Sequence, residues 1–315
     1  MFSVGDIYKR IKPFKAKIAS HPQKLYFAKV DVQSAFDTIP QAAIVGLLDS
    51  IPQSRQYRLS KYLEVAPSLL AQPSHSKAKA KPKLVRRWPL AATRKRDTPS
   101  FLGLLESDDR AAKRRNTVFV DSFGSKRDCE TGELLRLIAS HIQQNLVKIG
   151  KKFYRQKRGI PQGSVLSSTL CNYFYADLEA HVLVPFLGLP PGSAPGEKGR
   201  GDGQEDYLLL RLIDDFLLIT TDVRKASRFV ETMHRGVPEY GVAVNPQKTL
   251  VNFELEVDGQ PVPKISSGEG FPYCGTKINC ETLDITRARD KDKKDSSKSY
   301  SVTMAESCAW LRVPD

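Results

Sequence analysis

The sequence predicts an α+β fold in which helices back an antiparallel sheet. Apolar, strand-like residues run from Tyr26 to Val30, and two further runs, Leu208–Ile213 and Phe216–Ile219, flank a pair of aspartates as the arms of a hairpin would. Between these strands, three segments show the helical spacing of apolar residues: Pro40–Ile51, Glu133–Ile149 and Ser164–His181.

The helix expected over Glu133–Ile149 has the most regular pattern. Gly150 follows it and can serve as its C-cap. His141 on this helix is interpreted as structural, because no cluster of Cys or carboxylates stands at metal-ligand spacing around it. The apolar residues that define the pattern follow one another at steps of three or four: Leu135, Ile138, Ile142, Leu146 and Ile149.

Length and composition fit one large or two modest domains. The chain has 315 residues, of which 40% are hydrophobic, and this is enough for a buried core. Lys and Arg number 49 against 35 acidic residues, so the formal net charge is +14. The excess favours a polyanionic partner, nucleic acid above all, although solvated surface charge gives the same composition.

Cysteine spacing and hydropathy exclude several classes of protein. The five cysteines are odd in number and show no CxxC spacing, so they indicate neither a disulfide framework nor a zinc site. The segment 1–17 has no continuous apolar core, and no stretch has the length of apolar sequence that a membrane helix needs. We therefore expect a soluble protein of a reducing compartment, without a membrane partner.

A basic segment interrupts the chain between about Ala66 and Asn116, where we expect a loop-rich insertion. Lys77–Arg96 holds nine basic residues and no acidic one, together with two prolines that would interrupt a helix. Trp88 among these arginines could stack on a nucleic-acid base, but a disordered, solvated segment is the favoured interpretation. A nuclear import signal is a further hypothesis for the same residues.

Asp214 and Asp215 stand side by side between two apolar runs. Adjacent carboxylates raise one another's pKa unless a cation neutralises them, although an isolated Asp-Asp pair is more often an ordinary turn. Asp31 changes this interpretation because it also follows a hydrophobic strand, and three carboxylates on adjacent strands can bind two Mg²⁺ ions. Asp37 is interpreted as a cap of the following helix and is left out of the site.

Two Mg²⁺ ions in one site imply phosphoryl transfer. Such ions, about 3.5–4 Å apart, activate an attacking 3′-hydroxyl and stabilise a departing pyrophosphate, so no covalent protein nucleophile is needed. The loop Arg158–Ser164 supplies glycines where a backbone must approach a flat ligand closely. Gln162 in this loop can hydrogen-bond to a nucleotide or a template.

Five segments resemble the motifs of one enzyme family. In chain order they resemble motifs A, B′, C, D and E of the reverse transcriptases: Val30–Asp37, Gly159–Ser164, Leu212–Phe216, Arg235–Gly241 with Asn245–Thr249, and Phe271–Gly275. The residues of motifs D and E most resemble those of the telomerase reverse transcriptases. The 128 positions between Asp31 and Gly159 point to the same family, because telomerases carry an insertion in the fingers there.

The resemblance implies roles for individual residues. Asp31, Asp214 and Asp215 would be the catalytic metal ligands, with the Val32 carbonyl in addition. Lys248 would protonate or neutralise the leaving pyrophosphate as a catalytic general acid, and a solvated surface lysine is the alternative.

The resemblance also implies contacts with the substrates. Phe36 would be a steric gate that rejects ribonucleotides, with a core aromatic as the alternative. Gln162 and Gly163 would contact the incoming nucleotide and the template. The primer grip would consist of five consecutive residues: Phe271, Pro272, Tyr273, Cys274 and Gly275.

The implied architecture is a reverse transcriptase palm, an antiparallel sheet backed by helices, with partial fingers. Residues 1–51 would begin the palm and fingers with motif A, 52–150 would be a fingers insertion of basic loop plus helix, and 151–290 would carry motifs B′, C, D and E. Residues 291–315 are polar and unlike the family, so we expect a disordered tail.

The implied reaction is RNA-templated addition of deoxynucleotides to a DNA 3′ end. Its partners would be a telomerase RNA template, a telomeric single-stranded DNA primer, deoxynucleoside triphosphates and telomerase accessory proteins, in the nucleus at the chromosome telomere. Two alternatives stay open: a retroelement reverse transcriptase, and an inactive fragment that only binds nucleic acid.

Overall fold

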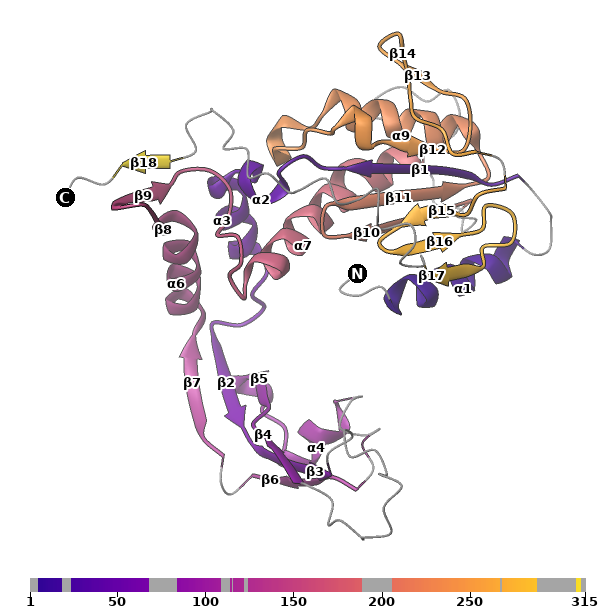
Figure 1. Ribbon diagram of the computed structural model, residues 1–315. Coiled ribbons are helices and arrows are strands. Elements are labelled where there is room, and N and C mark those ends of the chain that lie inside the picture. The colour runs from indigo at the N-terminus through magenta and orange to yellow at the C-terminus, as the bar shows by residue number, and fades with distance from the viewer. Residues whose placement is uncertain are drawn as a thin grey trace, which may run out of the picture. The chain divides into compact units, whose positions relative to one another are not determined.

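The computed structural model in Figure 1 describes residues 5–18, 24–67, 84–108, 114, 116–121, 124–188, 206–266, 268–287 and the backbone of 310–312. The chain divides into two compact units. The main unit comprises residues 1–47 and 141–315, and the insertion unit comprises residues 48–140. Both units combine helices with antiparallel strands, so the predicted α+β class is confirmed.

A four-stranded antiparallel sheet forms the centre of the main unit. Its strands are, in spatial order, β10 (Tyr207–Leu212), β11 (Asp215–Thr220), β1 (Tyr26–Asp31) and β12 (Leu250–Val251). Every residue of β11 after the first is buried. Such a continuous apolar strand is expected where other elements cover both faces of a sheet.

Helix α9 (Val223–Arg235) packs on β1 and β11 (Figure 1). Asp222 begins the helix as its N-cap, because its side chain accepts a hydrogen bond of 2.8 Å from the Arg224 amide. Gly236, with a φ of 79°, ends it. The buried side chains recur at helical spacing and face the sheet: Ala226, Phe229, Val230 and Met233.

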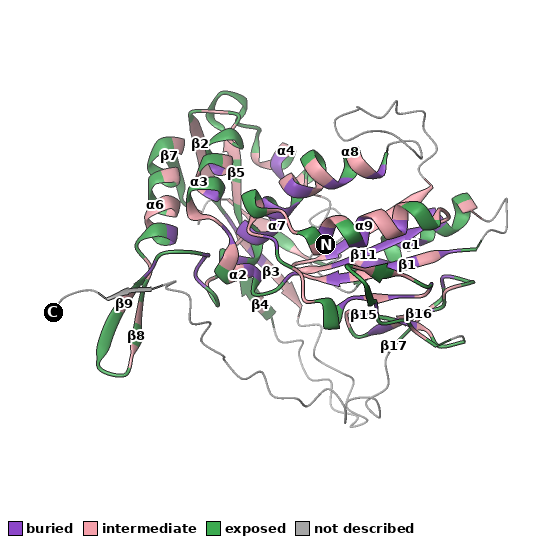
Figure 2. Cartoon of the chain, turned by 90° about the horizontal axis from the view of Figure 1, so that it is seen from above, coloured by how far each residue is buried: buried purple, intermediate pink, exposed green. Residues whose placement is uncertain are grey.

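A second layer packs on the other face of this sheet. It buries Leu217 and Ile219, which alternate along β11. It consists of α1 (Gly5–Ile18) and a three-stranded sheet: β15 (Phe271–Tyr273), β16 (Thr276–Ile278) and β17 (Ile285–Arg287). The rings of Phe27 and Phe271 lie 5.1 Å apart and join the two sheets. Figure 2 shows the resulting buried positions in purple along β1 and β11.

Two of the predicted helices are confirmed. Pro40–Ile51 forms α3 (Gln41–Ser50), and Ser164–His181 forms α7 (Ser167–Leu178), continued by a π-helical turn (Glu179–Leu183) and α8 (Val184–Leu187). The remaining elements of the main unit are short: α2 (Ala35–Thr38), β9 (Lys152–Gln156), two 3₁₀ turns (Pro238–Tyr240 and Pro246–Lys248), β13 (Glu256–Val257) and β14 (Gln260–Pro261).

The helix predicted over Glu133–Ile149 is wrong at its C-terminal end. Helix α6 (Thr131–Gln143) stops earlier, and β8 (Leu146–Ile149) pairs with β9 as a hairpin. Gly150 has a φ of 63° in the turn between these strands, so it closes a hairpin and does not cap the helix. The spacing of the last two apolar residues suits a helix and a strand alike, and the turn decides between them.

The insertion unit contains two three-stranded antiparallel sheets. Strand β2 (Gln56–Lys61) lies between β5 (Leu90–Arg94) and β7 (Lys126–Glu130). In the second sheet, β3 (Leu63–Pro67) lies between β4 (Leu84–Arg87) and β6 (Val118–Val120). The unit also contains a 3₁₀ turn (Lys95–Asp97), α4 (Phe101–Glu106) and the first part of α6.

The expectation of a loop-rich segment from Ala66 to Asn116 is therefore wrong for its described part. Strand β4 holds two apolar residues followed by two arginines, and β5 is apolar up to Thr93 and Arg94. Pro89 falls between the two strands, where no ladder hydrogen bond is lost. The residues 68–83, with the first part of the basic run and its first proline, lie outside the described residues.

Most of the expected tail, 291–315, also lies outside the described residues. Within it, the backbone of β18 (Trp310–Arg312) pairs antiparallel with β9. Among the described helices, none combines the length and the apolar character that crossing a bilayer requires.

Candidate active site

Three aspartates meet at one end of the central sheet. Strands β1 and β11 are antiparallel, and their register places Asp31 directly opposite Asp215. Asp214 precedes β11 in the turn from β10. One carboxylate oxygen from each of the three residues lies within 4.8 Å of the other two, and all three side chains are partly buried. Asp31 is far from Asp214 and Asp215 in the sequence, and the pairing of β1 with β11 brings the three residues together.

The turn that carries Asp214 has an unusual backbone. Leu212 pairs with Asp215, so the two turn residues are Ile213 and Asp214, one position earlier than the predicted Asp-Asp tip. Ile213 has a φ of 60°, in the left-handed region that glycine usually occupies and that β-branched residues avoid. Such a conformation costs on the order of 1–3 kcal/mol and persists only where the surroundings hold it.

Two hydrogen bonds hold this turn. The Val32 amide donates to the Asp214 carbonyl at 3.2 Å, and the Arg211 guanidinium donates to the Ile213 carbonyl at 3.1 Å. The first bond ties motif A to motif C directly. The second comes from a side chain that was not among the predicted site residues.

Arg211 is a buried cation in a network with α7. Only 5% of its side chain is exposed, and it pairs with the carboxylate of Glu179 in the π-helical turn. Its guanidinium also donates to the side-chain and backbone oxygens of Asn172, at 2.8 and 3.1 Å. The rings of Tyr175 and Phe216 flank it at 5.9 and 5.7 Å. One signal for Arg211 is present in the sequence, since a lone Arg inside a buried apolar strand must find charged and polar partners.

Burial and mutual repulsion disfavour the ionised acids. Burial, reinforced by the charges of Asp215 and Asp31, raises the pKa of Asp214 to about 6. Burial also raises the pKa of Asp215, while the ammonium of Lys29 opposes the rise from 3.8 Å. Lys29 was missed in the sequence, although it lies two residues before Asp31 and therefore on the same face of β1.

Lys248 lies beside the acid cluster. Its ammonium is 2.8 Å from a carboxylate oxygen of Asp31, and its side chain is more than half exposed. The 3₁₀ turn that carries it is capped by Asn245, whose side chain accepts from the Gln247 amide at 3.0 Å. Lys248 is thus both solvated and paired with the acid cluster.

The half-buried Phe36 belongs to α2, five residues after Asp31. The carbonyl of Phe36 accepts a hydrogen bond of 2.7 Å from the Ile160 amide, which joins α2 to the glycine-rich loop. Gln162 and Gly163 in that loop are exposed. Asp37 lies inside α2 and does not cap α3, since α3 begins only at Gln41, so that interpretation was wrong.

The segment 271–275 comprises β15 and the turn of the β15–β16 hairpin, beside the acids. Phe271 and Tyr273 are buried, and the Tyr273 hydroxyl donates to the Asp215 carbonyl at 3.0 Å. The Cys274 thiol lies 3.8 Å from the Asp215 carboxylate. Pro272 and Gly275 are exposed. Two of the five residues therefore support the hairpin from the core, and the other three present a surface.

A cavity of about 500 Å³ adjoins this hairpin. Its walls include Tyr273 and Cys274 and carry three lysines from different elements, Lys29, Lys264 and Lys277. Glu269 is the one acid among the lining residues, so the lining has a net positive charge, which suits the phosphates of a nucleic-acid strand.

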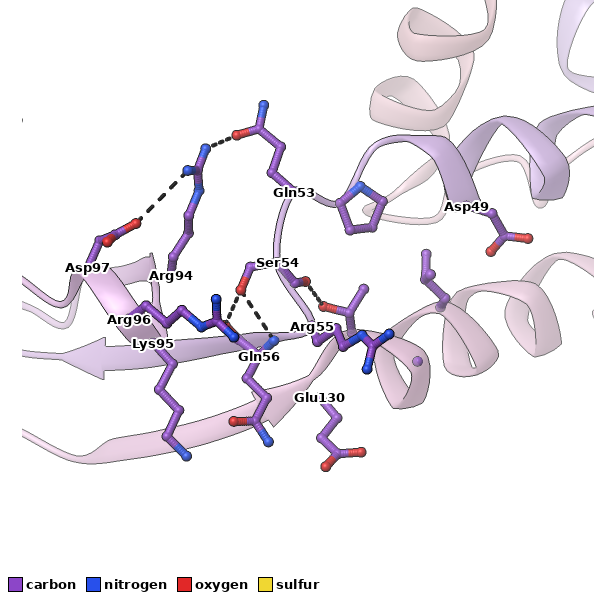
Figure 3. A pocket seen from close by; sticks show the side chains of 14 residues that line it. Asp49, Gln53, Ser54, Arg55, Gln56, Arg94, Lys95, Arg96, Asp97 and Glu130 are labelled. Atoms are coloured by element: carbon purple, nitrogen blue, oxygen red, sulfur yellow. Dashed lines mark hydrogen bonds and ion pairs between the residues drawn. The ribbon is translucent and has the colours of Figure 1, made fainter.

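A larger cavity, of about 1200 Å³, belongs to the insertion unit (Figure 3). Four cations and three acids line it together: Arg55, Arg94, Lys95, Arg96, Asp49, Asp97 and Glu130. Figure 3 shows Arg94 directed to Gln53 and Asp97, so part of its positive charge is compensated within the unit. Trp88, in the same unit, is half exposed and has the Lys61 ammonium 5.4 Å from its ring centre.

Comparisons with known proteins identify relatives of this chain. Residues 123–278 match the family described as Reverse transcriptase (RNA-dependent DNA polymerase). Telomerase reverse transcriptase of Mus musculus is 30% identical over 90% of this chain and 24% of its own length, and that of Oryzias latipes is 32% identical over 91% and 24%. The chain thus spans about a quarter of the length of these curated relatives.

Solved telomerase structures share the fold. The telomerase of Candida albicans, in a complex with a TWJ fragment of telomeric RNA, aligns with a TM-score of 0.55 and 20% identity over 91% of this chain and 35% of that chain. Apo telomerase of Candida tropicalis gives the same TM-score and identity, over 91% and 37%. The predicted resemblance to the telomerase reverse transcriptases is confirmed by the curated relatives and the family match, and the solved structures show that the fold is shared.

Proposed function

We propose that this chain is the catalytic core segment of an RNA-directed DNA polymerase that adds telomeric deoxynucleotides to chromosome 3′ ends. The observation that carries the proposal is the convergence of Asp31, Asp214 and Asp215 through the register of β1 and β11. Strand pairing that opposes two carboxylates is unfavourable by itself, so it indicates a site built for cations.

The residues fit a pair of Mg²⁺ ions. Three carboxylates offer hard oxygen ligands, and the two nearby ammonium groups, of Lys29 and Lys248, leave the cluster one negative charge in excess when all three acids are ionised. The carbonyl of Val32 is proposed as a further ligand. When bound, the two ions would activate the primer 3′-hydroxyl and stabilise the charge of the departing pyrophosphate.

The chain's own residues complete the site. Lys248, exposed and held beside Asp31, can give a proton to the leaving pyrophosphate. Phe36 would stand against the 2′ position of the sugar, where an added hydroxyl would clash. Gln162 and Gly163 would meet the incoming nucleotide and the template. Pro272, Cys274 and Gly275 would contact the primer 3′ end, supported from beneath by Phe271 and Tyr273.

The proposed partners follow from the family and the charge. They are a telomerase RNA template, a telomeric single-stranded DNA primer, deoxynucleoside triphosphates and telomerase accessory proteins, met in the nucleus at the telomere. A relative's solved structure contains a telomeric RNA fragment. The formal net charge of +14 supports nucleic-acid partners for this chain.

The test is primer extension by the 315-residue chain on a DNA primer annealed to an RNA template. We expect extension that depends on Mg²⁺ and is abolished in Asp214→Asn. The matched control is Asp258→Asn, an exposed acid in the β13–β14 turn of the same unit, which should extend as the wild type does. Extension that survives in Asp214→Asn would remove this residue from the reaction.

A second candidate function is nucleic-acid binding without catalysis. The formal net charge of +14 and the three lysines around the cavity beside the β15–β16 hairpin favour it, since both suit a polyanion and neither requires catalysis. Duplex binding that weakens with salt, with no Mg²⁺-dependent extension, would support this second candidate over the polymerase.

A further inference from the structure

Helix α2 carries Phe36 but cannot hold its own position. It has four residues, Ala35–Thr38, which is one turn. Its N-cap, Ser34, has a φ of 49° and makes no side-chain capping bond. A single turn has little intrinsic stability, so its place must be set by neighbouring segments.

Gly159 of motif B′ lies against one part of α2. Its φ is 74°, and a β-carbon there would lie 2.2 Å from the Phe36 carbonyl oxygen and 2.6 Å from the Asp37 α-carbon. The Gly159 amide donates to the Ile39 carbonyl at 2.9 Å, and the next amide, of Ile160, donates to the Phe36 carbonyl at 2.7 Å. The absence of a side chain is what permits these backbone contacts.

Gly241 of motif D lies against the end of the same turn. Its φ is 63°, and a β-carbon there would lie 2.2 Å from the Thr38 carbonyl oxygen. The segment that follows is also fastened to motif A, because the Gln33 amide donates to the Ala243 carbonyl at 2.7 Å. The preceding residue, Tyr240, donates from its hydroxyl to the Asp177 carboxylate at 2.6 Å and so anchors the motif D turn on α7.

We propose that Gly159 and Gly241 act together as positioning residues for Phe36. This glycine clamp would fix the distance between the Phe36 ring and the sugar of the incoming nucleotide, and would thereby set the discrimination against ribonucleotides. The inference rests on the proposed function, in which Phe36 is the steric gate. Each glycine acts through the backbone of α2, which is what a β-carbon at either position would meet first.

The size of the effect follows from the contacts. A methyl group 2.2 Å from a carbonyl oxygen must move by about 1 Å to reach an ordinary contact, and no side-chain rotation can relieve a clash with backbone. A displacement of about 1 Å in an active site can change rates about 100-fold. We expect the ratio of deoxynucleotide to ribonucleotide incorporation to change about tenfold or more.

The test compares Gly159→Ala and Gly241→Ala with matched glycine variants. Gly259 has a φ of 71° and Gly150 a φ of 63°, close to the clamp values, but a β-carbon at either would meet nothing within 4 Å. Gly259→Ala and Gly150→Ala therefore carry the same backbone strain without the clash. The assay measures incorporation of a single dNTP and of the matching rNTP. The ratio of deoxynucleotide to ribonucleotide incorporation should change in Gly159→Ala and Gly241→Ala and stay at the wild-type value in Gly259→Ala and Gly150→Ala.

A second kind of variant tests the clamp without a steric clash, in case the alanine variants misfold. Tyr240→Phe removes the bond to Asp177 without adding an atom, and it should change the ratio in the same direction by a smaller factor. In a Phe36→Ala background, Gly241→Ala should have no further effect on the ratio, because the gate through which it acts is gone.

A measurement without catalysis separates this inference from the polymerase proposal. A 4-fluorophenylalanine placed at position 36 reports the surroundings of that ring by ¹⁹F NMR. We expect its resonance to shift in both clamp variants and to stay in place in the two matched variants. An unmoved resonance in the clamp variants, or an unchanged ratio in an active enzyme, overturns the clamp. Absence of extension by the wild type instead counts against the polymerase and leaves the NMR result decisive.

Discussion

Asp31 and Asp215 face each other directly across two hydrogen-bonded antiparallel strands. Like charges in this cross-strand position destabilise a sheet, and Asp214 adds a third carboxylate at the adjoining turn. The sheet nevertheless places them there with a strained residue, Ile213, and a buried cation, Arg211, in support. The opposed carboxylates and the strained backbone lower the stability of the fold, and a function that depends on bound cations would explain why they are present.

Lys248 is expected to act on chemistry more than on binding. Lys248→Ala should lower kcat about 100-fold, as the loss of a general acid does, with a small change in the KM for the nucleotide. Single-turnover extension assays measure both. Lys15→Ala is the matched control, because Lys15 also makes an exposed ion pair, of 2.7 Å with Asp284, away from the acids. Equal effects of the two variants would place Lys248 outside the reaction.

Arg211 is expected to hold the turn that carries Asp214. Arg211→Met leaves Glu179 without its cation and the Ile213 carbonyl without a donor, so we expect a loss of about 3–5 kcal/mol in the free energy of unfolding. Urea denaturation measures it. Arg58→Met, which breaks the exposed pair with Asp128, is the control and should cost far less. Similar losses in the free energy of unfolding of the two variants would show that Arg211 contributes no more than an exposed ion pair does.

His234 is expected to make stability depend on pH. Burial lowers its pKa below the ordinary value of 6.5, and Asp258 opposes the shift only partly. In the unfolded chain His234 therefore takes up a proton more readily than in the folded chain. The contribution of the neutral, buried imidazole to the free energy of unfolding is complete above pH 6.5 and is lost as the pH falls through the native pKa. Melting temperatures between pH 7.5 and 5 should fall more steeply for the wild type than for His234→Gln. Parallel slopes would contradict the assignment.

The sequence predicts the site better than its surroundings. The runs before Asp31 and around Asp214 are apolar apart from Lys29 and Arg211, as is expected of strands covered on both faces, so β1, β10 and β11 could be recognised. The hairpin follows from the two runs and fixes Asp215 beside Leu212, within one position of the expectation. Bringing Asp31 to the same place needed only the pairing of β1 with β11.

Other features depend on long-range contacts that no local pattern contains. Strand β7 is almost wholly exposed, so it lacks the alternation by which a half-buried strand is recognised. The role of Gly241 depends on the Thr38 carbonyl, which lies more than two hundred positions away. The end of α6 depends on whether Leu146–Ile149 finds a partner strand, and β9 provides it.

Metal binding by the acid cluster tests the central claim most directly. Mn²⁺ can be titrated into the chain with an annealed duplex, a non-extendable primer and the next dNTP, while electron paramagnetic resonance reports the free ion. We predict that Asp31→Asn weakens Mn²⁺ binding by about tenfold or more, since it removes a proposed ligand that only folding brings to Asp214 and Asp215. Asp258→Asn should bind as the wild type does, and equally tight binding by Asp31→Asn would contradict the shared metal site.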